Sequence, residues 1–191
     1  VTIRGFASED DWAQVQADLA QLASVTRQNR FTDIDTLLVA QGNAHVTRLT
    51  IAENGALAPY KEHLRPAVDS LGSRELVIGA HLAATLGLTV GDNVSALFSS
   101  GAYQNTLRPG TLQIVSLLSS DTEIDQVFSM AGRGSVEIDE SSQGSALALH
   151  LVDPLEAPQL ARYLRQTLPP AFWVTDWTMA HVDQRPQAQV R

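Results

Sequence analysis

Apolar residues recur at helical spacing near both ends of the chain. The first predicted helix covers about residues 9–23, and its apolar face consists of Trp12, Val15, Leu19 and Leu22. Ser8 and Asp11 precede that face at nearly the spacing of a capping box. The second predicted helix begins near Pro158, because proline suits a first helical turn, and its apolar face consists of Leu160, Tyr163, Leu164 and Leu168. Each helix therefore has one face to bury against another element.

Alternating or continuous apolar runs predict strands at both ends and through the middle of the chain. These strands cover residues 1–7, 36–40, 44–51, 76–78, 94–98, 111–118, 127–130, 145–152 and 172–175. Gly42 and Asn43 separate the second strand from the third, which is typical of a hairpin. Helices near the ends and strands in the middle predict an α+β fold with one discontinuous subdomain. We assign residues 1–55 and 143–191 to this subdomain and residues 56–142 to an inserted β-rich subdomain.

Residues 73–98 combine the strongest local signals. The apolar run Leu76–Ile78 ends at Gly79 and leads into a short apolar helix, and Gly87 stands where a helix stop belongs. Gly91 and the two residues after it favour a tight turn before the next strand. The residues alone indicate a compact strand–helix–turn–strand unit.

Composition and charge exclude several classes of partner and site. The chain has 191 residues, enough for a substantial core, and a net charge of −8. Neutralising phosphates needs clustered Lys and Arg, so nucleic acid is not expected as the main partner. The absence of cysteine excludes disulfides, thiolate nucleophiles and Cys-ligated zinc. The chain contains no apolar run of the ~20 residues that span a bilayer, and it begins without Met, so we expect it to be an excised part of a longer protein.

Candidate catalytic and metal sites are weak. The five histidines are scattered, without an HxH or HExxH spacing, and the chain contains no GxSxG elbow or phosphate loop. Asp121, Glu123 and Asp125 alternate and could bind a cation, but Gln126 and Val127 break the pattern of a calcium loop, and a solvated acidic turn is the simpler interpretation. We predict no catalytic residue, no metal and no cofactor. A free-standing enzyme remains the rival class.

Residues 101–110 form a second candidate site. This polar stretch joins two predicted strands and carries Tyr103, Leu107 and Arg108, and Tyr and Arg are enriched at protein interfaces. A plain surface loop and a docking element explain the residues equally well. We expect the three tryptophans, Trp12, Trp173 and Trp177, to anchor the core rather than to stack on a ligand.

The central stretch also carries a resemblance to a known family. ELVIGAHLAATLGLTVGD, from Glu75 to Asp92, resembles a signature of the ABC-transporter permeases of the lipoprotein-releasing (LolC/LolE) type, within the MacB/FtsX-like superfamily. DPLEA at residues 153–157 and TDW at 175–177 are similar to later motifs of that family and follow in the same order. The resemblance extends over about residues 8–185.

The resemblance implies a fold and a function. The discontinuous subdomain would be porter-like, and the inserted subdomain would be sabre-like. The chain would be a periplasmic domain of a permease in the bacterial inner membrane, with ATP hydrolysis on a separate cytoplasmic subunit. A partner permease, a lipoprotein substrate and a periplasmic lipoprotein carrier are the implied partners. The carrier would dock on a hook-like loop that comprises Tyr103, Gln104, Asn105, Thr106, Leu107, Arg108 and Pro109. The alternative is a related MacB/FtsX-like permease that exports another substrate or transmits force to a periplasmic partner.

Overall fold

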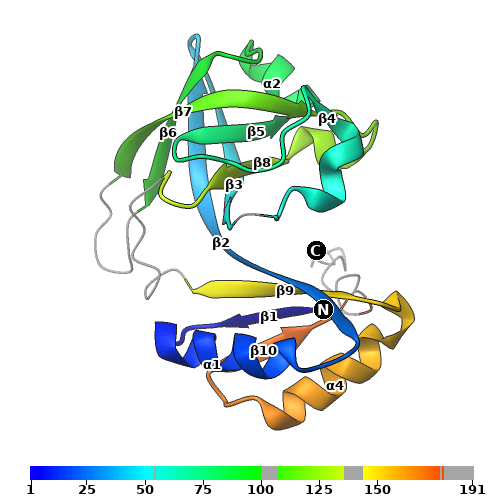
Figure 1. The fold of residues 1–191 in the computed structure, drawn as a ribbon. Helices are drawn as coiled ribbons and strands as arrows, with labels where there is room; N and C mark the ends of the chain where they lie inside the picture. The colour runs from blue at the N-terminus through cyan, green and yellow to red at the C-terminus, as the bar shows by residue number, and fades with distance from the viewer. Residues whose placement is uncertain (54, 100–106, 136–143, 177, 179–191) are drawn as a thin grey trace, which may run out of the picture. The chain divides into compact units, whose positions relative to one another are not determined.

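The chain forms two compact units. The structure is a computed structural model that describes residues 1–53, 55–99, 107–135, 144–176 and 178 (Figure 1). Unit 1 comprises Val1–Gln28 and Gly144–Arg191, and unit 2 comprises Asn29–Gln143. The predicted α+β class is confirmed. The predicted boundary after residue 55 lies inside unit 2 and is corrected to residue 28, because the hairpin of residues 31–52 pairs along its whole length and joins the strands of unit 2.

Unit 1 is a small antiparallel sheet with two helices on one face (Figure 1). Its elements are β1 (Thr2–Gly5), α1 (Glu9–Ala20), the first residues of β2 (Val25–Ala40), β9 (Ser145–Leu151), the 3-10 turn η3 (Pro154–Glu156), α4 (Ala157–Thr167) and β10 (Phe172–Thr175). β1 lies between β10 and β9 and is antiparallel to both. Strands from the two distant ends of the chain therefore complete one sheet.

The core of unit 1 lies between this sheet and its helices. α1 begins at a complete capping box between Ser8 and Asp11, and it buries the predicted residues Trp12, Val15 and Leu19. Trp12 contacts Phe172 edge to face, with ring centroids 4.9 Å apart. Residues from α4 and the three strands complete the cluster, namely Ile3, Leu147, Leu149, Ala161, Leu164 and Val174. Tertiary burial of these faces holds the short helices in place, since isolated helices of this length are marginal.

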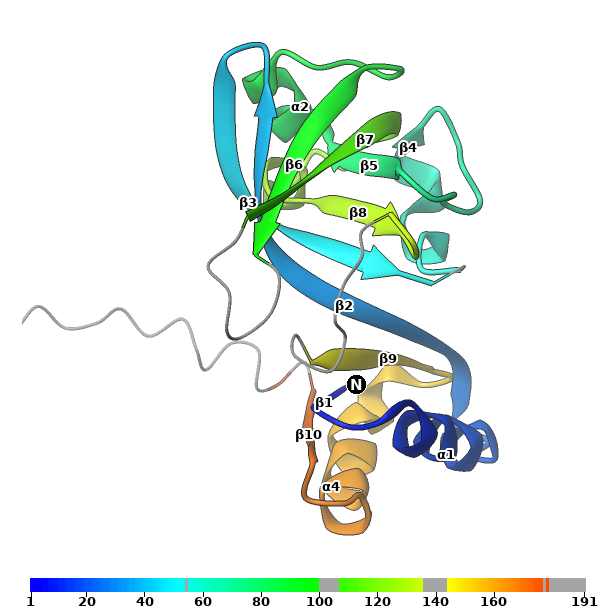
Figure 2. The same cartoon turned by 90° about the vertical axis from the view of Figure 1, so that its left-hand side faces the viewer.

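Unit 2 is built around a closed ring of strands. β2 pairs with β3, β3 with β8, β8 with β5, β5 with β7, β7 with β6, and β6 returns to β2. Figure 2 shows these strands around a common interior. The elements are β3 (Asn43–Ala52), the 3-10 turn η1 (Ala58–His63), β4 (Leu64–Arg65), β5 (Glu75–Gly79), α2 (Ala80–Leu86), β6 (Asn93–Ser99), β7 (Leu107–Leu118), the 3-10 turn η2 (Glu123–Gln126) and β8 (Ser129–Gly132).

Closure of the ring pairs the strand edges with one another, and inward-facing side chains fill its interior. The largest cluster of the unit includes Leu38, Leu49, Leu76, Ile78, Leu82, Leu86, Leu112 and Ile114. A smaller cluster of Leu57, Leu64, Val77, Leu118 and Met130 lies beside it. The inserted subdomain is thus β-rich, with α2 as the one α-helix among its described residues.

Several predicted details are wrong. The predicted strand of residues 36–40 starts too late: β2 is one continuous strand from Val25, and it includes residues 25–31, for which the sequence favours an extended conformation without defining a strand. Trp173 is 45% exposed, because β10 alternates and sends Phe172 and Val174 to the core instead. Tyr163, expected on the apolar face of α4, is 53% exposed. Trp177 lies outside the described residues.

Candidate functional site

The predicted hook-like loop falls partly on residues that the structure describes. Tyr103, Gln104, Asn105 and Thr106 lie outside the described residues. Leu107, Arg108 and Pro109 belong to β7, where they pair with Ser99, Phe98 and Leu97 of β6. The prediction that the loop continues to residue 110 is therefore wrong: β6 and β7 pair as far as Ser99 and Leu107, so the connection between these strands comprises residues 100–106.

Gly110 explains why the strand begins so early. A Cβ added at Gly110 would lie 3.0 Å from the Phe98 ring, so the absence of a side chain leaves room for that ring beside the strand. Pro109 and Gly110 look like turn residues in the sequence, but cross-strand packing holds them in β7. The missed signal is Phe98 on the neighbouring strand β6.

An apolar row crosses the outer surface of the unit 2 ring next to this connection. Cross-strand pairing aligns Val46 of β3 with Leu37 of β2, Leu37 with Leu97 of β6, and Leu97 with Pro109 of β7. Val46 is 74% exposed, and Leu37 and Leu97 are partly exposed. The residues on either side of Leu37 and Leu97 are buried, as the period-two alternation of strands requires; they are Thr36, Leu38, Ala96 and Phe98. The apolar row therefore consists of uncharged side chains, and its last member, Pro109, belongs to the predicted docking segment.

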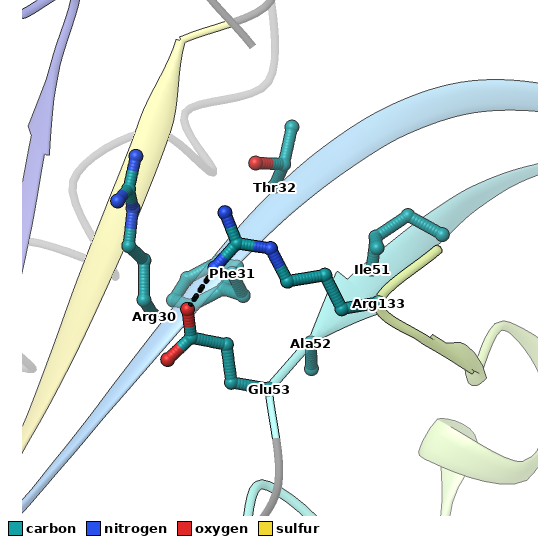
Figure 3. Close-up of a pocket in the computed structure, with 7 residues that line it drawn as sticks. All are labelled: Arg30, Phe31, Thr32, Ile51, Ala52, Glu53 and Arg133. Carbon is teal, nitrogen blue, oxygen red and sulfur yellow. Dashed lines mark hydrogen bonds and ion pairs between the residues drawn. The ribbon is translucent and has the colours of Figure 1, made fainter. Parts of the chain in front are cut away.

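A cavity lies at another edge of unit 2 (Figure 3). Ala52 pairs with Gly132 in the parallel β3–β8 ladder, so the next residues, Glu53 and Arg133, come side by side. Arg133 Nη1 donates to Glu53 Oε1 at 2.5 Å. The pocket of Figure 3 is lined by these two residues together with Arg30, Phe31, Thr32, Ile51 and Ala52. Glu53, Arg133 and Ala52 also line a second, neighbouring cavity of about 390 Å³, which Leu71 completes. The only titratable side chains in the described lining of the two cavities are Arg30, Glu53 and Arg133.

Local hydrogen bonds and glycines shape the Glu75–Asp92 stretch. Glu75 Oε2 accepts from Gly72 N at 2.7 Å, and Asp92 Oδ2 accepts from Thr89 N at 2.8 Å. Gly87 is the left-handed C-cap of α2, with φ of 70°, which glycine adopts at little cost. A Cβ on Gly79 would lie 2.2 Å from the Asp125 backbone oxygen. The polar and glycine residues of this stretch therefore specify a local fold.

The predicted acidic turn is held together by one buried carboxylate. Asp125 accepts from Ser120 N at 2.9 Å, from Ser120 Oγ at 2.7 Å and from Asp121 N at 3.0 Å. Burial by itself raises the pKa of Asp125, but these hydrogen bonds and the charge of His63 outweigh it and hold the pKa below its usual value. Asp125 is thus a structural cap of the loop. Among the described residues, no group of three His, Asp or Glu side chains is arranged to hold a metal ion.

The two later motifs are also structural in the described residues. Asp153 Oδ1 accepts from Leu155 N at 2.9 Å and begins η3. Asp176 is buried and accepts from Thr178 N at 2.8 Å and from Arg165 Nη2 at 3.1 Å. The hydrogen bonds from Thr178 lower the pKa of Asp176, in spite of burial, and Arg165 lowers it further. None of the described helices is long and apolar enough to cross a membrane.

Comparisons with known proteins identify the fold. No protein-family profile and no curated protein sequence matches the chain. The periplasmic region of MacB from Actinobacillus actinomycetemcomitans is similar, with a TM-score of 0.57 and 12% identity over 97% of this chain and 92% of that chain. The extracellular domain of the noncanonic ABC-type transporter YknZ from Gram-positive bacteria is similar, with a TM-score of 0.54 and 13% identity over 92% of this chain and 100% of that chain. The chain therefore has the fold of these two transporter domains.

Proposed function

We propose that this chain is an extracytoplasmic domain of a MacB/FtsX-like ABC-transporter permease. The observation that carries the proposal is the fold likeness to the MacB periplasmic region over 97% of the chain. The motifs at Glu75–Asp92, 153–157 and 175–177 support it, because they occur in the order found in such permeases. Unit 1 contains both ends of the described chain, as expected for a domain inserted between two membrane-spanning segments.

We propose further that the parent permease releases lipoproteins from the bacterial inner membrane to a periplasmic carrier. A separate cytoplasmic subunit would hydrolyse ATP, with a second permease completing the transporter. This domain would contribute contacts and motion instead of catalytic residues. The resemblance of the Glu75–Asp92 signature to LolC/LolE-type permeases supports this specific role, and the apolar row beside the 100–106 connection supplies a surface that a carrier could contact.

The likeness to MacB and YknZ supports a second candidate function. In that case the domain belongs to a permease that exports another substrate or transmits force to a periplasmic partner. The two candidates share the fold and the membrane arrangement. They differ in whether a lipoprotein carrier binds this domain.

Carrier binding in solution tests the first candidate. The purified chain is immobilised, and retention of the periplasmic lipoprotein carrier is measured for the wild type and for a Tyr103→Ala/Leu107→Ala/Arg108→Ala variant. The proposal expects retention by the wild type and its loss in the variant. A Val90→Ala variant is the matched control, since Val90 is an exposed apolar residue of unit 2 outside both the loop and the apolar row. No retention by the wild type would contradict carrier docking and favour the second candidate.

A further inference from the structure

Two exposed apolar side chains project from one end of the unit 1 sheet. Leu155 is 76% exposed and Val152 is 68% exposed, the highest values among the large apolar residues described in this unit. Both lie in the short connection between β9 and α4, within or next to the DPLEA motif. We call Val152 and Leu155 the apolar tip.

Hydrogen bonds fix the apolar tip in place. Val152 N donates to Ser24 O at 2.9 Å, which ties the end of β9 to the connection before β2. Asp153 Oδ1 accepts from Leu155 N at 2.9 Å, and Pro154 restricts the backbone between them. These restraints keep the Leu155 side chain exposed to solvent. In a loop without them, the side chain could pack back onto the protein.

The apolar tip lies at the end of the sheet from which both chain ends leave. Thr2 pairs with Thr175 on one side and with Ala148 on the other. Val1 and Leu149 exchange backbone hydrogen bonds, with Leu149 N donating to Val1 O at 2.7 Å. β9 continues past Val1 and reaches the apolar tip within a few residues. Val1, the end of β10 and the apolar tip thus share one end of unit 1.

We propose that the apolar tip contacts the interfacial layer of the lipid bilayer to which the parent permease is anchored. This inference rests on the proposed function, which joins both ends of the chain to membrane-spanning segments and so turns this end of the sheet toward the bilayer. Apolar side chains on a turn gain free energy when they leave water for the boundary between headgroups and acyl chains. Asp153 and Glu156 lie on either side of Leu155. Their negative charges would be repelled by anionic headgroups, so the lipid surface that we propose is zwitterionic.

The chain suits a direct test because it contains no cysteine. Single substitutions Leu155→Cys and Phe6→Cys each receive an environment-sensitive fluorophore. Phe6 is the matched control: it is 59% exposed and apolar, but it follows the opposite end of β1. Each labelled chain is held through an N-terminal histidine tag on phosphatidylcholine vesicles with nickel-chelating lipid, with and without brominated phospholipid.

The proposal expects brominated lipid to quench the label at position 155 and to leave the label at position 6 unchanged. Val152→Ser in the Leu155→Cys background lowers the quenching, and adding anionic lipid lowers it as well. The N-terminal tag by itself holds this end of unit 1 near the vesicle, so the effect of Val152→Ser decides the test. Equal quenching at position 155 with and without Val152→Ser, or stronger quenching at position 155 on anionic vesicles, overturns the proposal. This outcome is separable from the proposed function, because carrier retention is measured in solution without lipid.

Discussion

Asp125 provides the sharpest test of how unit 2 is held together. The substitution Asp125→Ala removes the acceptor of two backbone N–H groups, from Ser120 and Asp121, and of the Ser120 hydroxyl. A buried donor that loses its acceptor costs about 1–3 kcal/mol. Ser120 is partly exposed and Asp121 is exposed, so water recovers part of this loss. We therefore expect the free energy of unfolding to fall by about 2 kcal/mol, and by about half of that for Asp125→Asn, which keeps one acceptor oxygen.

The pH dependence follows from the direction of the pKa shift. The pKa of Asp125 is lower in the folded chain than in the unfolded chain, so its contribution is fully present above about pH 4 and is lost as the pH falls through the folded pKa. The difference between wild type and Asp125→Asn should be constant from pH 7 to 5 and should shrink below pH 4. Urea unfolding followed by circular dichroism at each pH measures it.

The matched control is Glu123→Gln, which makes the same carboxylate-to-amide change at an exposed position of the same loop. We expect this variant to differ from wild type by less than about 0.5 kcal/mol. If Asp125→Asn and Glu123→Gln unfold at the same urea concentration at pH 7, the assignment of Asp125 as the cap of this loop is refuted.

Four further substitutions test core packing and one exposed ion pair. Gly79→Ala should lower the free energy of unfolding by more than about 2 kcal/mol, because its Cβ meets the Asp125 backbone at 2.2 Å; thermal unfolding measures the loss. Trp12→Ala should lower the free energy of unfolding by about 3–5 kcal/mol, and Trp173→Ala by less than half as much, because Trp12 is 1% exposed and Trp173 is 45% exposed. Equal losses in urea unfolding would contradict the assignment of Trp12 to the core. Arg133→Ala should cost about 1 kcal/mol or less, as expected for an exposed ion pair, and a larger loss in the same assay would show that the cavity depends on it.

Local patterns in the sequence predict much of unit 1. The capping box, the apolar face of α1 and the β9 and β10 strands follow from spacing within a few residues, and the structure has them close to the predicted positions. The exposure of Trp173 could not be predicted in this way. In a four-residue strand, period-two alternation leaves open which face turns inward, and the packing of Phe172 against Trp12 decides it.

The ring of unit 2 depends on contacts that no local pattern contains. β6 closes the ring by pairing with β2, and these strands are more than fifty residues apart in the sequence. The early start of β7 depends on the Phe98 ring beside Gly110, whereas Pro109 and Gly110 taken alone favour a turn. For the same reason the apolar row was not predicted: Val46, Leu37, Leu97 and Pro109 become neighbours only when four strands take their register.

The most direct test of the central claim is lipoprotein release by the reconstituted parent transporter. Proteoliposomes containing the full-length permease, its partner permease and the ATPase subunit are loaded with a lipoprotein, and ATP-dependent transfer to the soluble periplasmic carrier is measured. The account predicts transfer with the wild type and reduced transfer, with ATP hydrolysis retained, when Tyr103, Leu107 and Arg108 are replaced by alanine. ATP hydrolysis without lipoprotein transfer by the wild type would contradict it and would favour a permease with another substrate.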